Sequence, residues 1–86
     1  MMAFLLPKTV TQENALLLEK EGLSVVPTIN TVDCSALQDF DSTVLTVLLS
    51  WQKKLAANHQ KIAFIQPPEK LKVLAGVYGV SELLGF

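Results

Sequence analysis

Residues 42–58 constrain the fold more than any other part of the chain, because their pattern predicts a helix that is covered on two sides. At 100° per residue, one apolar face collects Val44, Val47, Leu48, Trp51 and Leu55. A second apolar stripe consists of Leu45, Leu49 and Ala56. The remaining sector holds Ser42, Thr43, Thr46, Ser50, Lys53 and Lys54. We expect the first face to pack on a β-sheet.

The start of this helix carries a polar pair, Asp41-Ser42. Ser42 suits the N-cap position, where its hydroxyl would accept a hydrogen bond from a free backbone N–H group of the first turn. The Asp41 carboxylate would lie beside the positive end of the helix dipole. Capping alone is therefore a sufficient reason for both residues.

Three segments have the composition of β-strands. Residues 28–34 are rich in β-branched side chains, and residues 61–66 contain an almost continuous apolar run. Residues 3–6 form a third, short candidate that stops at Pro7. We expect the strand at 28–34 to be central, because helices flank it on both sides in the sequence.

Two further helices are expected. The first covers residues 12–21, is capped by Thr9 or Thr11, and ends at Gly22. Residues 25–26 would then be briefly extended before Pro27.

The last expected helix begins after Pro67-Pro68 and ends at Gly79. Helical spacing predicts an inner face made of Leu71, Leu74, Ala75 and Tyr78. Residues 80–86 would add a last helical turn or an edge strand. The order of these elements predicts a single α/β domain over residues 1–86, with a mixed β-sheet and helices packed on one side. Its short N-terminal strand would leave a sheet edge that can pair with another chain, so a homodimer is an option.

The composition excludes several classes of function. A net charge of −1 argues against nucleic-acid binding, which needs a basic face. No apolar run approaches the roughly 20 residues that span a bilayer, so no direct membrane insertion is expected. The single cysteine, Cys34, forbids an internal disulfide and fits a reducing, cytoplasmic location. The mean hydropathy of +0.39 is high for a small soluble chain and suggests apolar surface that a partner covers.

The sequence offers no constellation for catalysis. Asp33, Asp39 and Asp41 lie close together, but acidic residues between a strand and a helix are typical of turns and caps. His59 is expected in a solvated turn, and Cys34 as a buried, small apolar side chain. We therefore expect no catalytic residue, no metal site and no cofactor.

The order of several motifs resembles the STAS domain family. The motif Asp33-Cys34-Ser35 ends a predicted strand, and Asp41-Ser42 begins a Leu-rich helix that carries Trp51. Residues 10–15 (Val-Thr-Gln-Glu-Asn-Ala) are similar to the opening of that family's first helix, and residues 74–84 to its last helix and C-terminal end. The resemblance implies an α/β fold and a role in protein binding.

The resemblance implies two kinds of partner. In anti-anti-sigma factors a kinase phosphorylates the residue that corresponds to Ser42, but small residues follow it there, where this chain has Thr43 and Val44. Another branch is a small subunit that binds the cytoplasmic ATPase of the Mla phospholipid ABC transporter. The short chain, the pair Lys53-Lys54 and the ending with Tyr78-Gly79 look closer to that branch, which we favour.

The favoured branch would make contact through the Ser42 end of the helix. The expected partner-binding residues are Asp41, Ser42, Leu45, Thr46 and Leu49. In the alternative function, Ser42 is the phosphorylation site and an anti-sigma kinase is the partner. Either function fits a cytoplasmic protein, which the transporter would hold at the inner membrane through its partner. The two leucines have a second interpretation, in which they pack under the helix expected at residues 71–78.

Overall fold

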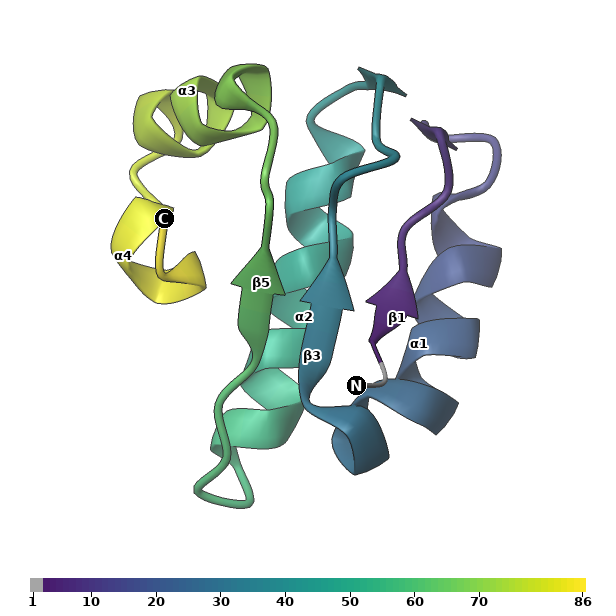
Figure 1. Cartoon of the computed structure of the whole chain (residues 1–86), viewed down its shortest axis with the longest axis vertical. Helices are drawn as coiled ribbons and strands as arrows, with labels where there is room; N and C mark the ends of the chain where they lie inside the picture. The colour runs from purple at the N-terminus through teal and green to yellow at the C-terminus, as the bar shows by residue number, and fades with distance from the viewer. Residues whose placement is uncertain (1–2) are drawn as a thin grey trace.

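The computed structural model describes residues 3–86, except for the side chain of Pro27, and forms a small α/β fold. Its central sheet has the order β1-β3-β5, with β1 at Phe4–Leu5, β3 at Thr31–Asp33 and β5 at Ala63–Ile65. A second pair consists of β2 (Thr9–Val10) and β4 (Asp39–Phe40), which lie beyond the ends of β1 and β3 (Figure 1). The predicted central position of the strand within residues 28–34 is confirmed, although β3 is shorter.

All strand pairings among residues 3–86 are parallel, so the prediction of a mixed sheet was wrong in this respect. A helix separates each pair of neighbouring strands in the central sheet: α1 (Ala15–Ile29) joins β1 to β3, and α2 (Thr43–Ala56) joins β3 to β5. Such crossovers return the chain to the same end of the sheet, which makes the next strand parallel.

The helices lie on one side of this sheet, as predicted. Figure 1 shows α1 and α2 behind the strands. Phe4, Val32 and Phe64 share one register row and therefore one face. The Phe4 ring meets Trp51 of α2 edge-on, with centroids 5.3 Å apart, so this row faces the helices.

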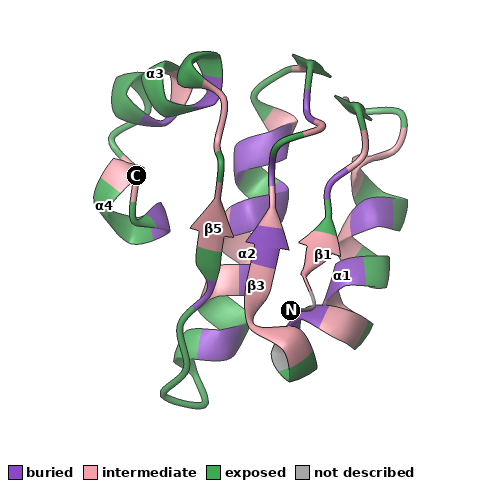
Figure 2. Ribbon diagram, in the orientation of Figure 1, coloured by how far each residue is buried: buried purple, intermediate pink, exposed green. Residues whose placement is uncertain are grey.

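The core is centred on α2, whose predicted sheet face is confirmed. Val44, Val47, Leu48, Trp51 and Leu55 are all at most 1% exposed. Figure 2 shows buried residues along α2, which lies behind the strands. Leu45 is also buried, at 3% exposure, so the covered part of the helix includes one residue of the second stripe.

The helix α1 is longer than predicted, because it continues through Gly22 and Pro27 to Ile29. Gly22 does not end the helix but is buried against Trp51, where a Cβ atom would overlap the indole ring. Val26, which was expected in an extended piece, is fully buried in the helix. The helix ends at Asn30, whose φ of 63° lets its N–H group donate to the Val26 carbonyl at 2.7 Å.

The C-terminal part contains α3 (Glu69–Val77), which begins after Pro68 as predicted, and α4 (Ser81–Leu84). Gly79 follows α3 with a φ of 70°, which agrees with the predicted helix end. Leu71 and Ala75 are buried, but Tyr78 is 57% exposed and does not belong to the inner face. The apolar tail forms a helical turn rather than an edge strand. Within residues 3–86, no helix combines the length and the apolar character needed to cross a membrane.

Candidate functional site

The candidate site begins at the N-terminus of α2, where Asp41 performs the capping that was predicted for Ser42. The Thr43 N–H group donates to Asp41 Oδ1 at 2.9 Å, and the Thr43 hydroxyl donates to the same oxygen. Hydrogen bonds from the Thr43 hydroxyl and N–H group hold the pKa of Asp41 below its usual value. Ser42 occupies the N-cap position but makes no side-chain cap hydrogen bond, because its φ of −63° and ψ of −14° are already helical.

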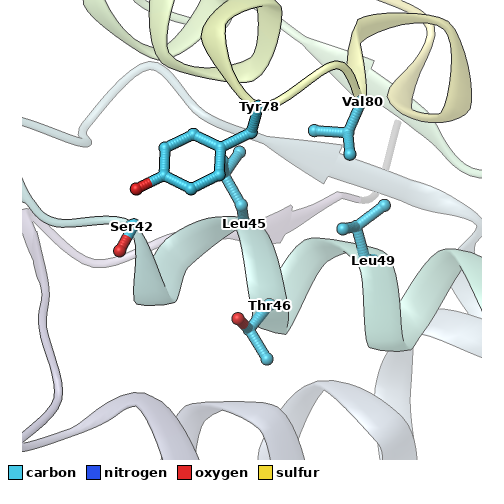
Figure 3. A pocket seen from close by; sticks show the side chains of 6 residues that line it. All are labelled: Ser42, Leu45, Thr46, Leu49, Tyr78 and Val80. Atoms are coloured by element: carbon cyan, nitrogen blue, oxygen red, sulfur yellow. The ribbon is translucent and has the colours of Figure 1, made fainter.

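Because Asp41 provides the cap, the Ser42 side chain makes no cap hydrogen bond. It lies exposed at the edge of a shallow groove of about 190 Å³. The groove lies between α2 and the segment that follows α3. Its lining consists of Ser42, Leu45, Thr46, Leu49, Tyr78 and Val80. Figure 3 shows Leu45 and Leu49 directed toward Tyr78 and Val80, whereas Thr46 points away from them.

A second groove, of about 220 Å³, adjoins Ser42 on its other side. Its lining consists of Phe40, Asp41, Ser42, Lys70, Val73, Leu74 and Val77. The Lys70 ammonium group lies 5.6 Å from the centroid of the Phe40 ring, within range of a cation–π contact. Ser42 is thus shared by two grooves, one bounded by α2 and Tyr78 and one bounded by α3.

The structure places four of the five predicted binding residues around the first groove and the fifth, Asp41, on the second. Ser42, Thr46 and Asp41 are exposed, Leu49 is partly buried and Leu45 is buried. Leu45 therefore supplies the floor of a groove rather than a protruding contact.

The polar row that Ser42 and Thr46 begin does not continue to Ser50. The Ser50 hydroxyl donates to the Glu19 carboxylate on α1 at 2.8 Å. Next to it, the Trp51 Nε1–H group donates to the Glu19 carbonyl at 3.0 Å. Ser50 therefore belongs to the contact between α1 and α2.

Sequence analysis missed the contribution of α3 to this surface. Val73 and Val77 are 57% and 76% exposed, and both line the second groove. The four-residue spacing between them was a usable signal, because it defines a second apolar side of α3 that faces away from Leu71 and Ala75.

The titratable residues near the site are set by local burial and hydrogen bonds. Burial, with a smaller effect of the Asp33 charge, raises the pKa of the Cys34 thiol to about 12, so the thiolate is not available at neutral pH. Hydrogen bonds from Ser35 lower the pKa of Asp33, whose Oδ1 accepts the Ser35 N–H group at 2.9 Å. His59 lies exposed in a turn, with a φ of 59°. Among residues 3–86, no group of three His, Cys, Asp or Glu side chains is placed to hold a metal ion.

Comparison with known proteins identifies the family. No curated protein and no solved structure matches the chain significantly. A family model described as "Mlab, STAS domain" matches residues 8–85, which is nearly the whole chain and includes both grooves. The chain therefore belongs to the STAS domain family.

Proposed function

We propose that this chain is a non-catalytic subunit that binds and supports the cytoplasmic ATPase of an Mla-type phospholipid ABC transporter. STAS domains generally mediate protein–protein contacts and are generally non-catalytic. The description of the matching family model supports the transporter branch. In this proposal Asp41, Ser42, Leu45, Thr46 and Leu49 form the docking surface, and no nucleic acid, cofactor or membrane insertion takes part.

The observation that carries the proposal is the exposed Ser42–Thr46 edge beside an open apolar groove. An apolar side chain of the ATPase would enter the groove between Leu49 and Tyr78. The small side chains of Ser42 and Thr46 let the partner's backbone approach closely, so the interface excludes water at its centre.

The proposal is tested by Thr46→Arg. Thr46 is exposed on α2, so the variant should fold normally. The added cation would be trapped without a counter-ion when the ATPase docks, which should cost several kcal/mol of binding free energy. A pull-down of the co-expressed ATPase should therefore lose the complex, with circular dichroism of the free chain as the folding control. Thr28→Arg, the same change at an exposed position of α1, should retain the complex. Normal capture by a folded Thr46→Arg variant would exclude this face as the docking site.

The alternative function is that of an anti-sigma factor antagonist that is switched by phosphorylation of Ser42. Its support is the exposed Ser42 side chain at a helix N-terminus, where the positive end of the helix dipole favours a phosphate. Against it, Asp41 already accepts from the Thr43 N–H group, and its carboxylate would repel an added phosphate. Phosphate on Ser42 by mass spectrometry, together with a null phenotype of Ser42→Ala, would favour this function and an anti-sigma kinase as the partner.

A further inference from the structure

The outer side of α1 carries an apolar stripe that nothing else in the described chain covers. Leu16 and Leu17 are 67% and 63% exposed and adjacent in the sequence, so together they present apolar surface to the solvent. Glu13 and Lys20 are also exposed and complete the spacing i, i+3, i+4, i+7, which places all four residues on one side of a helix. We call Glu13, Leu16, Leu17 and Lys20 the α1 stripe.

The α1 stripe points away from the core. The buried residues of α1, Leu18, Gly22 and Val26, lie on the opposite side of the helix, which packs against α2. Figure 1 shows α1 at one side of the molecule, next to the edge strand β1.

Glu13 lies one residue before Asn14, the N-cap of α1, in a turn that leads into the helix. The Ala15 N–H group donates to the Thr11 carbonyl at 2.9 Å, which is a bond of the helical i to i−4 type. The Thr11 hydroxyl accepts the Glu13 N–H group at 3.4 Å, so the turn before the helix is ordered by its own hydrogen bonds. This i to i−4 bond places position 13 of the backbone on the side of the helix that carries the two leucines.

The charges of the α1 stripe are arranged symmetrically about the leucine pair. Glu13 lies three residues before Leu16, and Lys20 lies three residues after Leu17. When two such helices pair in antiparallel orientation about a two-fold axis, the leucines meet at the centre and each Glu13 faces Lys20 of the second copy. In parallel orientation, like charges would face each other and repel.

We infer that the α1 stripe is an isologous, antiparallel interface between two copies of this chain. The stripe complements itself in charge, which a surface adapted to an unrelated partner does not require. With only two leucines per copy, the interface falls in the small and reversible class. No residue of the α1 stripe lines the grooves at Ser42, so the dimer presents two free docking surfaces and does not depend on the proposed partner.

Charge reversal tests this inference with the purified chain of residues 1–86. Sedimentation equilibrium over a range of concentrations should show a monomer–dimer equilibrium for the wild type. Glu13→Lys and Lys20→Glu should each weaken dimerisation by about tenfold or more, because two attractive pairs become two repulsive ones. An equimolar mixture of the two variants should form a heterodimer, since every charge then faces its opposite. Glu21→Lys makes the same charge change on the same helix, about 90° away from the stripe, and should leave dimerisation unchanged.

Three results would overturn the inference. One is a wild-type chain that stays monomeric at the highest concentration tested. Another is a mixture of the two reversed variants that forms no heterodimer although both are folded by circular dichroism. The third is a dimer that persists with unchanged affinity in the double variant Leu16→Gln, Leu17→Gln, which would place the contact elsewhere.

Discussion

Replacement of Gly22 by alanine tests how α1 and α2 are held together. Gly22 lies in the middle of α1 and is buried where the two helices cross. A Cβ atom at this position would lie 2.6 Å from Trp51 Nε1 and closer still to Cε2 and Cζ2. The indole ring cannot retreat easily, because Nε1 donates to the Glu19 carbonyl at 3.0 Å and Phe4 packs edge-on against the ring.

Two opposing effects determine how much Gly22→Ala changes the free energy of unfolding. In an open helix interior, a glycine-to-alanine change would stabilise the chain by about 1 kcal/mol through backbone entropy. Overpacking of a rigid core typically costs about 1–3 kcal/mol, and the overlap here involves several ring atoms and a hydrogen-bonded indole. We expect the steric cost to dominate and the free energy of unfolding to fall by about 2 kcal/mol.

Urea denaturation followed by the fluorescence of the single tryptophan, Trp51, measures this change. The matched control is Gly76→Ala in α3, where the nearest atom to an added Cβ is Ser81 Oγ at 3.7 Å. The control should raise the denaturation midpoint or leave it unchanged, whereas Gly22→Ala should lower it. Removing the ring with Trp51→Leu, followed by circular dichroism, should abolish the penalty of the alanine in a double-mutant cycle. A Gly22→Ala variant as stable as wild type would refute the close crossing of the helices.

Further predictions concern α2. Leu48→Ala removes a fully buried side chain and should lower the free energy of unfolding by about 2–5 kcal/mol in urea denaturation; an unchanged midpoint would contradict the orientation of the helix. Ser42→Ala should change stability by less than about 0.5 kcal/mol, because Ser42 makes no cap hydrogen bond, whereas Asp41→Ala should lower the midpoint measurably. The Asp41 pKa is lowered in the folded state, so the advantage of wild type over Asp41→Asn should be present at neutral pH and fade as the pH falls below the ordinary value of 3.8. An advantage that grows in acid would refute this assignment.

The sequence was most informative where periodicity is strong. All five residues predicted on the sheet face of α2 are buried. The position of a wide apolar face along a helix indicates directly which side packs on the core. The same argument failed for α1, where Gly22 and Pro27 carry the local signals of a helix end. Only the contact with Trp51, which lies 29 positions further along the chain, explains why the glycine is inside the helix. Local signals yield to tertiary packing in such cases.

The parallel direction of the strands follows from the order of elements that the sequence predicts. A helix was expected between the first and second strands and between the second and third, and such connections are typical of parallel sheets. At the site, exposure of Ser42 and Thr46 followed from the polar sector of the helix. The sequence could not predict that Asp41 rather than Ser42 is the cap. Both residue types are good caps, and the backbone angles decide between them.

The geometry at Asp41 bears on both proposed functions, because they make opposite demands on this residue. A docking surface needs a well-ordered first turn of α2, which begins at Thr43. The ionised Asp41 carboxylate orders this turn, because it accepts hydrogen bonds from the Thr43 N–H group and hydroxyl. A phosphorylation site needs a free N–H group and room for two negative charges at Ser42. The nearest N–H group is already engaged, and the low pKa keeps the competing carboxylate charged at neutral pH. The cap that leaves Ser42 free for contact therefore also opposes its phosphorylation, which favours docking of an unmodified surface.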